Sequence, residues 1–159
     1  MPLAGLESTT GTTIYVSAAE PATHDVGGFE DLTWTEVVGV VSFGAWGDES
    51  NDISEPLLSE GRTIHQNGLV DGGSVPVVVQ HRTTDAGSDI IKANAGSNTI
   101  MSVKKVYAES GDGEYASGVF SARKQREASN DSVRGYTCNF MANTSVVEAT
   151  AAEIAAENP

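Results

Sequence analysis

The chain has 159 residues, a net charge of −13 and a single cysteine, Cys138. This length predicts one domain with a real core, and a lone cysteine excludes an internal disulfide. The acidic balance disfavours a free nucleic-acid-binding protein, because binding phosphates needs clustered positive charge. With no leader-like segment and no apolar run of bilayer length, we expect a chain made in a reducing compartment and no membrane insertion of the monomer.

The charges are distributed unevenly along the chain. Residues 1–61 hold eleven acids and no Lys or Arg, whereas residues 62–134 hold nine basic and eight acidic residues. Residues 135–159 add three acids alone. Solubility is one interpretation of this acidity, and a surface that must not adhere to a polyanion is the more specific alternative.

The patterning predicts a mainly β protein. Short apolar runs alternate with turn clusters, and seventeen glycines accompany few aromatic residues. Gly39 inside one strand indicates a bulge or a close backbone approach, and the pairs Asn67-Gly68 and Asp112-Gly113 indicate turns. We expect Val26–Phe29 to form a turn region as well. The expected strands are 12–18, 32–43, 62–65, 75–82, 100–107, 115–123 and 133–141.

A single internal helix is expected at about residues 85–95. Thr84 or Asp85 serves as its N-cap, and Gly96 ends it. Ala86, Ile90 and Ala93 share one face, which must pack on the sheet because so short a helix is marginal alone. The fold class is therefore an antiparallel β-sandwich or barrel with one lateral α-helix.

Residues 44–61 are expected to form a long acidic loop. A structureless loop of this length usually signals a function, a partner or disorder. Disorder is disfavoured by four large apolar side chains in this segment, Trp46, Ile53, Leu57 and Leu58. Such an apolar area is expected to be buried against another protein surface. The domain is expected to span residues 1–143, with an arm at residues 1–10. Residues 144–159 form an acidic, Ala-rich tail, either a frayed helix or disordered.

Catalytic and metal-binding signals are weak. The histidines, His24, His65 and His81, lack metal-ligand spacing, and the acids of residues 48–55 lack the pattern of a calcium loop. No nucleophile elbow, zinc-binding helix motif or phosphate loop occurs, so we expect no enzyme and no cofactor. Cys138 alternates with Tyr136 and Phe140, which favours a small buried hydrophobe over a reactive thiol.

Two clusters of opposite charge remain. The acidic segment of residues 44–61 is complementary to the basic residues Arg123, Lys124 and Arg126. One copy of the chain could offer each cluster to a neighbour, which is a head-to-tail interface that closes into a ring or continues into a filament.

The order of these elements along the chain resembles that of a known family. The chain resembles the tail tube (major tail) proteins of long, non-contractile phage tails, a family related to gene transfer agents. The matching stretches, in order, are GTTIYVSAAEPAT, TWTEVVGVVSFGAWG, GLVDGGSVPVVV, TTDAGSDIIKANA and the last strand with its Asn143-Thr144 turn. They cover roughly residues 5–143, and their order and spacing carry the resemblance rather than any single motif.

The resemblance implies a virion protein that assembles itself into six-membered rings stacked as a hollow tube. In that family the long loop and the terminal arms reach neighbouring copies, and the tube surrounds a tape-measure protein and later conducts DNA without binding it specifically. Tail terminator or distal tail proteins are the other implied partners. The implied location is the virion tail, after assembly in the host cytoplasm.

Two other interpretations stay open. The acidic loop could be mobile while Trp46 packs on its own subunit, and the chain could be a monomeric β-sandwich binding or decoration module. Under the tube interpretation we expect contacts between subunits from one set of residues, namely Trp46, Asp48, Glu49, Asp52, Glu55, Leu57, Glu60, Arg62, Arg123, Lys124 and Arg126.

Overall fold

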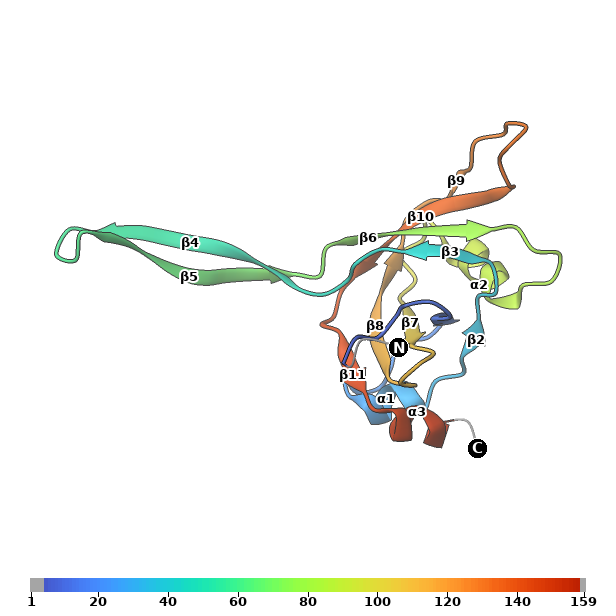
Figure 1. Ribbon diagram of the computed structural model, residues 1–159, viewed down its shortest axis with the longest axis horizontal. Coiled ribbons are helices and arrows are strands. Elements are labelled where there is room, and N and C mark those ends of the chain that lie inside the picture. Colours follow the sequence, from blue (N-terminus) through green and yellow to red (C-terminus); the bar gives the residue numbers. More distant parts are fainter. Residues whose placement is uncertain (1–4, 158–159) are drawn as a thin grey trace.

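A computed structural model of the protein describes residues 5–157, and it shows a rounded β body from which one long hairpin projects (Figure 1). Nine strands form one antiparallel sheet, and the hairpin is a separate two-stranded sheet. The strands of the large sheet are β1 (Thr13–Ser17), β2 (Thr35–Glu36), β3 (Val40–Phe43), β6 (Ser74–Gln80), β7 (Met101–Val106), β8 (Gly113–Phe120), β9 (Lys124–Gln125), β10 (Gly135–Ala142) and β11 (Val147–Ala149). The hairpin strands are β4 (Glu49–Leu57) and β5 (Arg62–Asp71), and the helices are α1 (Val26–Glu30), α2 (Ala86–Asn94) and α3 (Ala151–Glu157).

The large sheet curls but does not close. Its order is β2-β1-β7-β8-β10-β6-β3, with β11 beside the first part of β8 and β9 beside β10. Strands β2 and β3 therefore lie at the two ends of this path, although they follow each other in the chain. The expected class, an antiparallel β fold with a lateral helix, is confirmed.

Two apolar clusters fill the body. The larger one joins residues from both halves of the curled sheet, including Val16, Val79, Val103 and Phe140, with Ile91 of α2 packed against them. The smaller one, around Tyr115, joins α1, β11 and α3. The residues after position 143 thus belong partly to the body, since β11 pairs with β8 and α3 contributes a buried Ile154.

Helix α2 forms where the sequence predicts it. The Asp85 carboxylate accepts a hydrogen bond from the Ser88 N–H as the N-cap, and Gly96 follows with a φ of 82°. Helix α3 lies in the tail, where a frayed helix was one of the two expectations, whereas α1 was not expected as a helix. In α1, where a turn was predicted, the Asp25 side chain caps the Gly28 N–H and Phe29 is fully buried, so burial of one aromatic side chain stabilises a very short helix.

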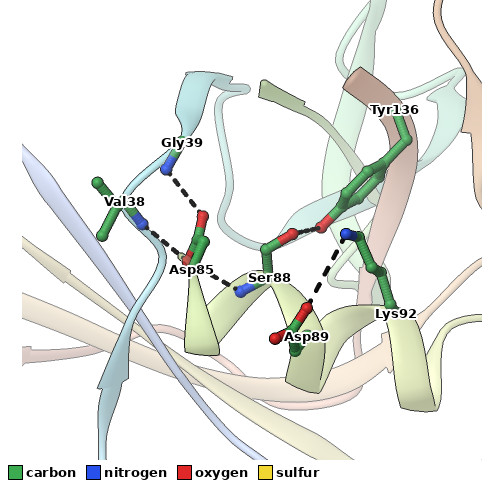
Figure 2. A network of polar contacts seen from close by, with 7 residues as sticks. All are labelled: Val38, Gly39, Asp85, Ser88, Asp89, Lys92 and Tyr136. Carbon is green, nitrogen blue, oxygen red and sulfur yellow. Dashed lines mark hydrogen bonds and ion pairs between the residues drawn. The ribbon is translucent and has the colours of Figure 1, made fainter. Parts of the chain in front are cut away.

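The predicted strand 32–43 is wrong as a single element. It is broken into β2 and β3 by a corner at residues 37–39, where the backbone N–H groups of Val38 and Gly39 donate to the buried Asp85 carboxylate (Figure 2). The close approach predicted at Gly39 is confirmed, because a Cβ there would lie 2.2 Å from the Gln80 carbonyl oxygen.

The turn predicted at Asn67-Gly68 is also wrong. Both residues lie within β5, at a bulge where the register with β4 shifts. A Cβ on Gly68 would lie 3.0 Å from the Ile53 side chain. The glycine therefore serves close packing across the hairpin rather than a change of chain direction. The β7–β8 hairpin predicted from Asp112-Gly113 is confirmed, although Gly113 itself is the first residue of β8 and the chain reverses just before Asp112.

Cys138 is buried, as expected, and this predicts a pH effect. Burial raises the pKa of the Cys138 thiol from 9.0 to about 11, and burial likewise raises the pKa of Tyr136 from 10.0 to about 12. The unfolded chain loses these protons first as pH rises, so the folded state binds more protons above pH 9. The free energy of unfolding should therefore be unaffected by these groups below about pH 9 and fall between about pH 9 and 12. Denaturant unfolding at a series of pH values measures this.

The Cys138→Ala variant serves as the control for that measurement. It should lose the part of the decline that begins near pH 9 and keep the part due to Tyr136. In the folded wild type the fraction of thiolate at pH 8 should be about 100-fold lower than in the unfolded chain, which follows from a pKa difference of about two units. Thiol labelling at equal rates in both states would contradict this account.

Candidate assembly interface

The hairpin of β4 and β5 is the most exposed part of the molecule. Every residue of β4 is exposed, and so is every residue of β5 except Gly68. At about 3.3 Å per residue, the hairpin extends roughly 30 Å from the body (Figure 1). An isolated two-stranded hairpin is marginally stable in water, so a partner surface that covers it would stabilise it.

The acidic segment 44–61 is thus not the structureless loop that the sequence predicts. It contains the whole of β4 and the tip that connects it to β5. The segment lacks the alternation of apolar and polar residues that predicts a strand, because this alternation arises where one face of a strand is buried in its own domain. Here neither face is covered by the body, so the composition of the segment suggested a loop.

The two faces of the hairpin differ in chemistry. Residues directly opposite each other in an antiparallel pair share a face, and the register pairs Ile53 with Gln66, Glu55 with Ile64 and Leu57 with Arg62. We call this the apolar face; its large side chains Ile53, Leu57 and Ile64 are 57%, 42% and 42% exposed.

The opposite face is polar. It pairs Ser54 with His65 and Asp52 with Asn67. His65 Nδ1 lies 2.9 Å from an Asp52 carboxylate oxygen, and the Ser50 hydroxyl donates to Asn67. Asp52 thus has a partner within the hairpin, and this face is suited to water rather than to a packed interface.

Trp46 anchors the base of the hairpin to its own chain. Its ring meets Phe43 edge-on at 5.2 Å between centroids and lies 6.4 Å from Phe140. Its indole N–H donates to the Glu114 carboxylate, which also accepts from the Tyr107 hydroxyl at 2.9 Å. This matches the alternative in which Trp46 packs on its own subunit, although the side chain remains only half-buried.

Lys105 completes this anchor. Its ammonium lies 3.7 Å from Glu114 and 5.1 Å from the Trp46 ring, within reach of a cation–π contact. Burial, followed by the Glu114 hydrogen bond and charge, raises the pKa of Tyr107 to about 12, so its hydroxyl remains a donor at every physiological pH. The direction in which the hairpin leaves the body is therefore set by packed and hydrogen-bonded groups.

Truncating the anchor should release the hairpin. We expect Trp46→Ala to lower the free energy of unfolding by about 2 kcal/mol, less than for a fully buried tryptophan. It should also speed proteolytic cleavage within residues 44–48. Trp46→Phe keeps the ring contacts and loses only the N–H, so its cleavage rate should stay near that of the wild type. Equal protection in Trp46→Ala and wild type would show that Trp46 does not hold the hairpin.

The predicted acidic residues all lie on the hairpin or beside its base. Asp48 and Glu49 are near the body, whereas Glu55 and Glu60 are near the tip. Arg62 also lies at the tip, opposite Leu57. It is therefore part of the hairpin and not part of the basic cluster at the other end of the molecule.

The three remaining predicted bases lie around β9. The Arg123 guanidinium carbon is 5.2 Å from the centre of the Tyr136 ring, Lys124 pairs with Thr137, and the Arg126 N–H donates to the Gly135 carbonyl. The structure adds bases that the sequence pattern missed, because they are far apart in the chain. They are His81, Lys92 and Arg134, which line one hollow together with Arg123.

Neither a metal site nor a membrane-spanning helix is seen in the described part of the chain. Among residues 5–157, no group of three or more His, Cys, Asp or Glu side chains is placed to hold a metal ion. No helix of that part is both long and apolar enough to cross a membrane.

Comparison with known proteins supports the fold. No protein-family model and no curated protein sequence matches the chain. Among solved structures it is similar to the tail tube of phage SPP1, with a TM-score of 0.62 and 11% identity over 91% of this chain and 80% of that chain. It is also similar to a chain of the phage p2 baseplate, with a TM-score of 0.57 and 8% identity over 85% of this chain.

This chain spans only 45% of the p2 baseplate chain, so that similarity concerns one part of a larger protein. At such identities the similarities establish the fold and not the activity. The chain has the fold of a phage tail tube protein, which confirms the fold implied by the sequence resemblance.

Proposed function

We propose that this chain, which has the tail tube fold, is the structural subunit of the tail tube of a long, non-contractile phage tail or of a related gene transfer agent. Copies form six-membered rings, and the rings stack into a hollow tube through which the genome passes into the host. The observation that carries this proposal is the long exposed hairpin on a tail tube fold.

The exposed surfaces support self-assembly. The hairpin presents apolar side chains that its own body leaves uncovered, and such side chains gain roughly 25 cal/mol per Å² when buried. The terminal strands of the large sheet, β2 and β3, each pair with one strand only among the described residues, and an unpaired edge is a liability that pairing with another copy removes. Both features are explained if the chain is one unit of a closed assembly.

The charge is compatible with a conduit for DNA. A tube wall rich in Lys or Arg would retain phosphates, whereas a chain of net charge −13 repels them. The proposed partners are a tape-measure protein inside the tube and a tail terminator or distal tail protein at its ends. The proposed locations are the host cytoplasm during assembly and then the virion tail.

Electron microscopy of the purified chain tests the proposal. We expect stacked rings or tubes at raised protein concentration, with sixfold symmetry in end views. A strict monomer at every concentration and salt, even when a tail initiator complex is supplied, would overturn it and favour the monomeric decoration module.

A second candidate is a ring component of a baseplate, which the similarity to the p2 baseplate chain favours. A baseplate ring would form single rings that do not stack. The length distribution of the particles in the same micrographs distinguishes the two candidates.

A further inference from the structure

A basic hollow lies at the opposite end of the body from the hairpin. We call it the basic socket; it has a volume of about 290 Å³ and is lined by His81, Lys92, Arg123, Gln125, Arg134, Gly135 and Tyr136. Three of these seven residues are Lys or Arg, of which the chain has only nine against twenty-two acids. Such a concentration of positive charge favours the binding of an anionic group.

Buried hydrogen bonds connect the residues at the floor of the socket. The Tyr136 hydroxyl lies 2.8 Å from the Ser88 hydroxyl, and Ser88 donates its N–H to the buried Asp85 (Figure 2). Lys92 and Arg123 approach the Tyr136 ring, at 5.9 and 5.2 Å from its centre. Tyr136 of β10 thus contacts both cations, Lys92 of α2 and Arg123 between β8 and β9, in the absence of any ligand.

The cations of the socket have few partners inside the chain. Lys92 lies 3.9 Å from Asp89, while Arg123 and Arg134 take part in no ion pair among residues 5–157. The other charged residues of the elements around the socket are Arg82, Asp85, Asp89, Lys124, Arg126, Glu127 and Asp131. Two free guanidinium groups at one hollow are suited to carboxylates, which they bind through paired hydrogen bonds.

The hairpin supplies carboxylates of the required kind. Residues 48–71 hold six acids and a single basic residue, Arg62. Glu55 and Glu60 near the tip are exposed, and their carboxylates take part in no hydrogen bond or ion pair among the described residues. Asp52, in contrast, is already paired with His65.

A hairpin cannot reach the socket of its own chain. Figure 1 shows β4 and β5 leaving one side of the body, while β9, α2 and the end of β6 lie on the other side. The Trp46 anchor fixes the base of the hairpin, so its tip does not turn back. Any contact between the tip and a socket must therefore join two copies.

We propose that the basic socket of one copy binds the Glu55 and Glu60 carboxylates of a second copy's hairpin. This inference rests on the proposed function, since it names the contact by which neighbouring subunits recognise each other. The contact is head-to-tail, and repeated head-to-tail contacts close into rings or continue along a tube. Because exposed ion pairs are weak singly, the contact mainly selects the partner and its register.

Charge reversal on each side tests the contact. The socket variant carries Arg123→Glu and Arg134→Glu, and the hairpin variant carries Glu55→Arg and Glu60→Arg. These side chains are exposed, so both variants should keep the fold, which circular dichroism verifies. Each variant alone should need at least a 10-fold higher concentration to assemble than the wild type.

An equimolar mixture of the two variants is the decisive sample. In alternating order, an acidic hairpin meets a basic socket and a basic hairpin meets an acidic socket, so the mixture should assemble near the wild-type concentration. The matched control carries Glu20→Arg and Asp31→Arg, exposed acids outside both surfaces, and should assemble like the wild type. Raised salt should weaken wild-type assembly.

The outcomes distinguish a failure of the proposed function from a failure of the proposed socket contact. If the wild type forms no rings or tubes, the proposed function fails. If the wild type assembles and both variants assemble equally well, or if the mixture does not recover, the socket contact is wrong. A nucleic acid is the competing occupant; binding of a fluorescent DNA duplex by the wild type that is lost in the socket variant, with assembly unchanged, would also overturn the contact.

Discussion

A chain carrying Ile53→Ser, Leu57→Ser and Ile64→Ser is expected to remain folded and to stop assembling at concentrations where the wild type forms tubes. The three side chains lie on the apolar face of the hairpin, and the body does not cover them. They are about half exposed, so each gains roughly 1 kcal/mol when a neighbour covers it, about half the value for full burial. Losing roughly 3 kcal/mol corresponds to about a 100-fold weaker contact.

The matched control tests the assignment of faces. Val70→Ser removes an exposed apolar side chain from the polar side of the hairpin, where Val70 lies opposite Ser50. We expect this variant to assemble within about threefold of the wild type. Analytical ultracentrifugation and electron microscopy measure assembly, and near-ultraviolet circular dichroism verifies the body. Equal loss in both variants would show that the two faces contact neighbours alike.

The parts of the fold that the sequence predicts are those with local chemical signals. Helix α2 follows from its Asp85 cap and from Gly96, and the β7–β8 hairpin follows from Asp112-Gly113. The broken strand at residues 37–39 could not be predicted, because its cause is Asp85, which lies 46 residues away from Gly39 in the chain. Local patterns do not report such contacts.

The candidate interface likewise has one part that the sequence predicts and one part that it does not. The acidic segment and the bases at Arg123 to Arg126 are visible as runs of charge in the sequence. The basic socket is not, because its bases meet only in the folded chain: His81 directly follows β6, Lys92 lies in α2, and Arg134 directly precedes β10. The hairpin was predicted as a loop because its strands have no partner face in their own domain, and a single-chain pattern cannot show a face that a second copy would cover.

The Asp85→Ala variant is expected to lose about 3 to 4 kcal/mol of the free energy of unfolding. One Asp85 oxygen accepts from Val38 and Ser88 at 3.2 and 3.1 Å, and the other accepts from Gly39 at 3.0 Å. Hydrogen bonds to a charged group contribute about 1.5–3 kcal/mol each, and removing a buried charge offsets part of their loss. The melting temperature should fall by roughly 10 °C for a chain of this size.

Two further variants identify the cause of this loss. Asp89→Ala removes an exposed carboxylate from the same helix and should change stability by no more than about 0.5 kcal/mol. Asp85→Asn keeps the shape but turns an amide donor toward one of the backbone donors, so it should recover little. A stable Asp85→Asn variant would show that the charge is dispensable.

The position of Asp85 connects stability to assembly. The carboxylate fixes the corner between β2 and β3, and β3 leads directly through Trp46 into the hairpin. The same carboxylate caps α2, whose Ser88 and Lys92 support the floor and wall of the basic socket (Figure 2). Loss of Asp85 should thus loosen the exit of the hairpin and the socket together. At temperatures where Asp85→Ala is still folded, its assembly should weaken more than that of a core variant matched to it in measured stability; the fully buried Val103 is a site for such a variant.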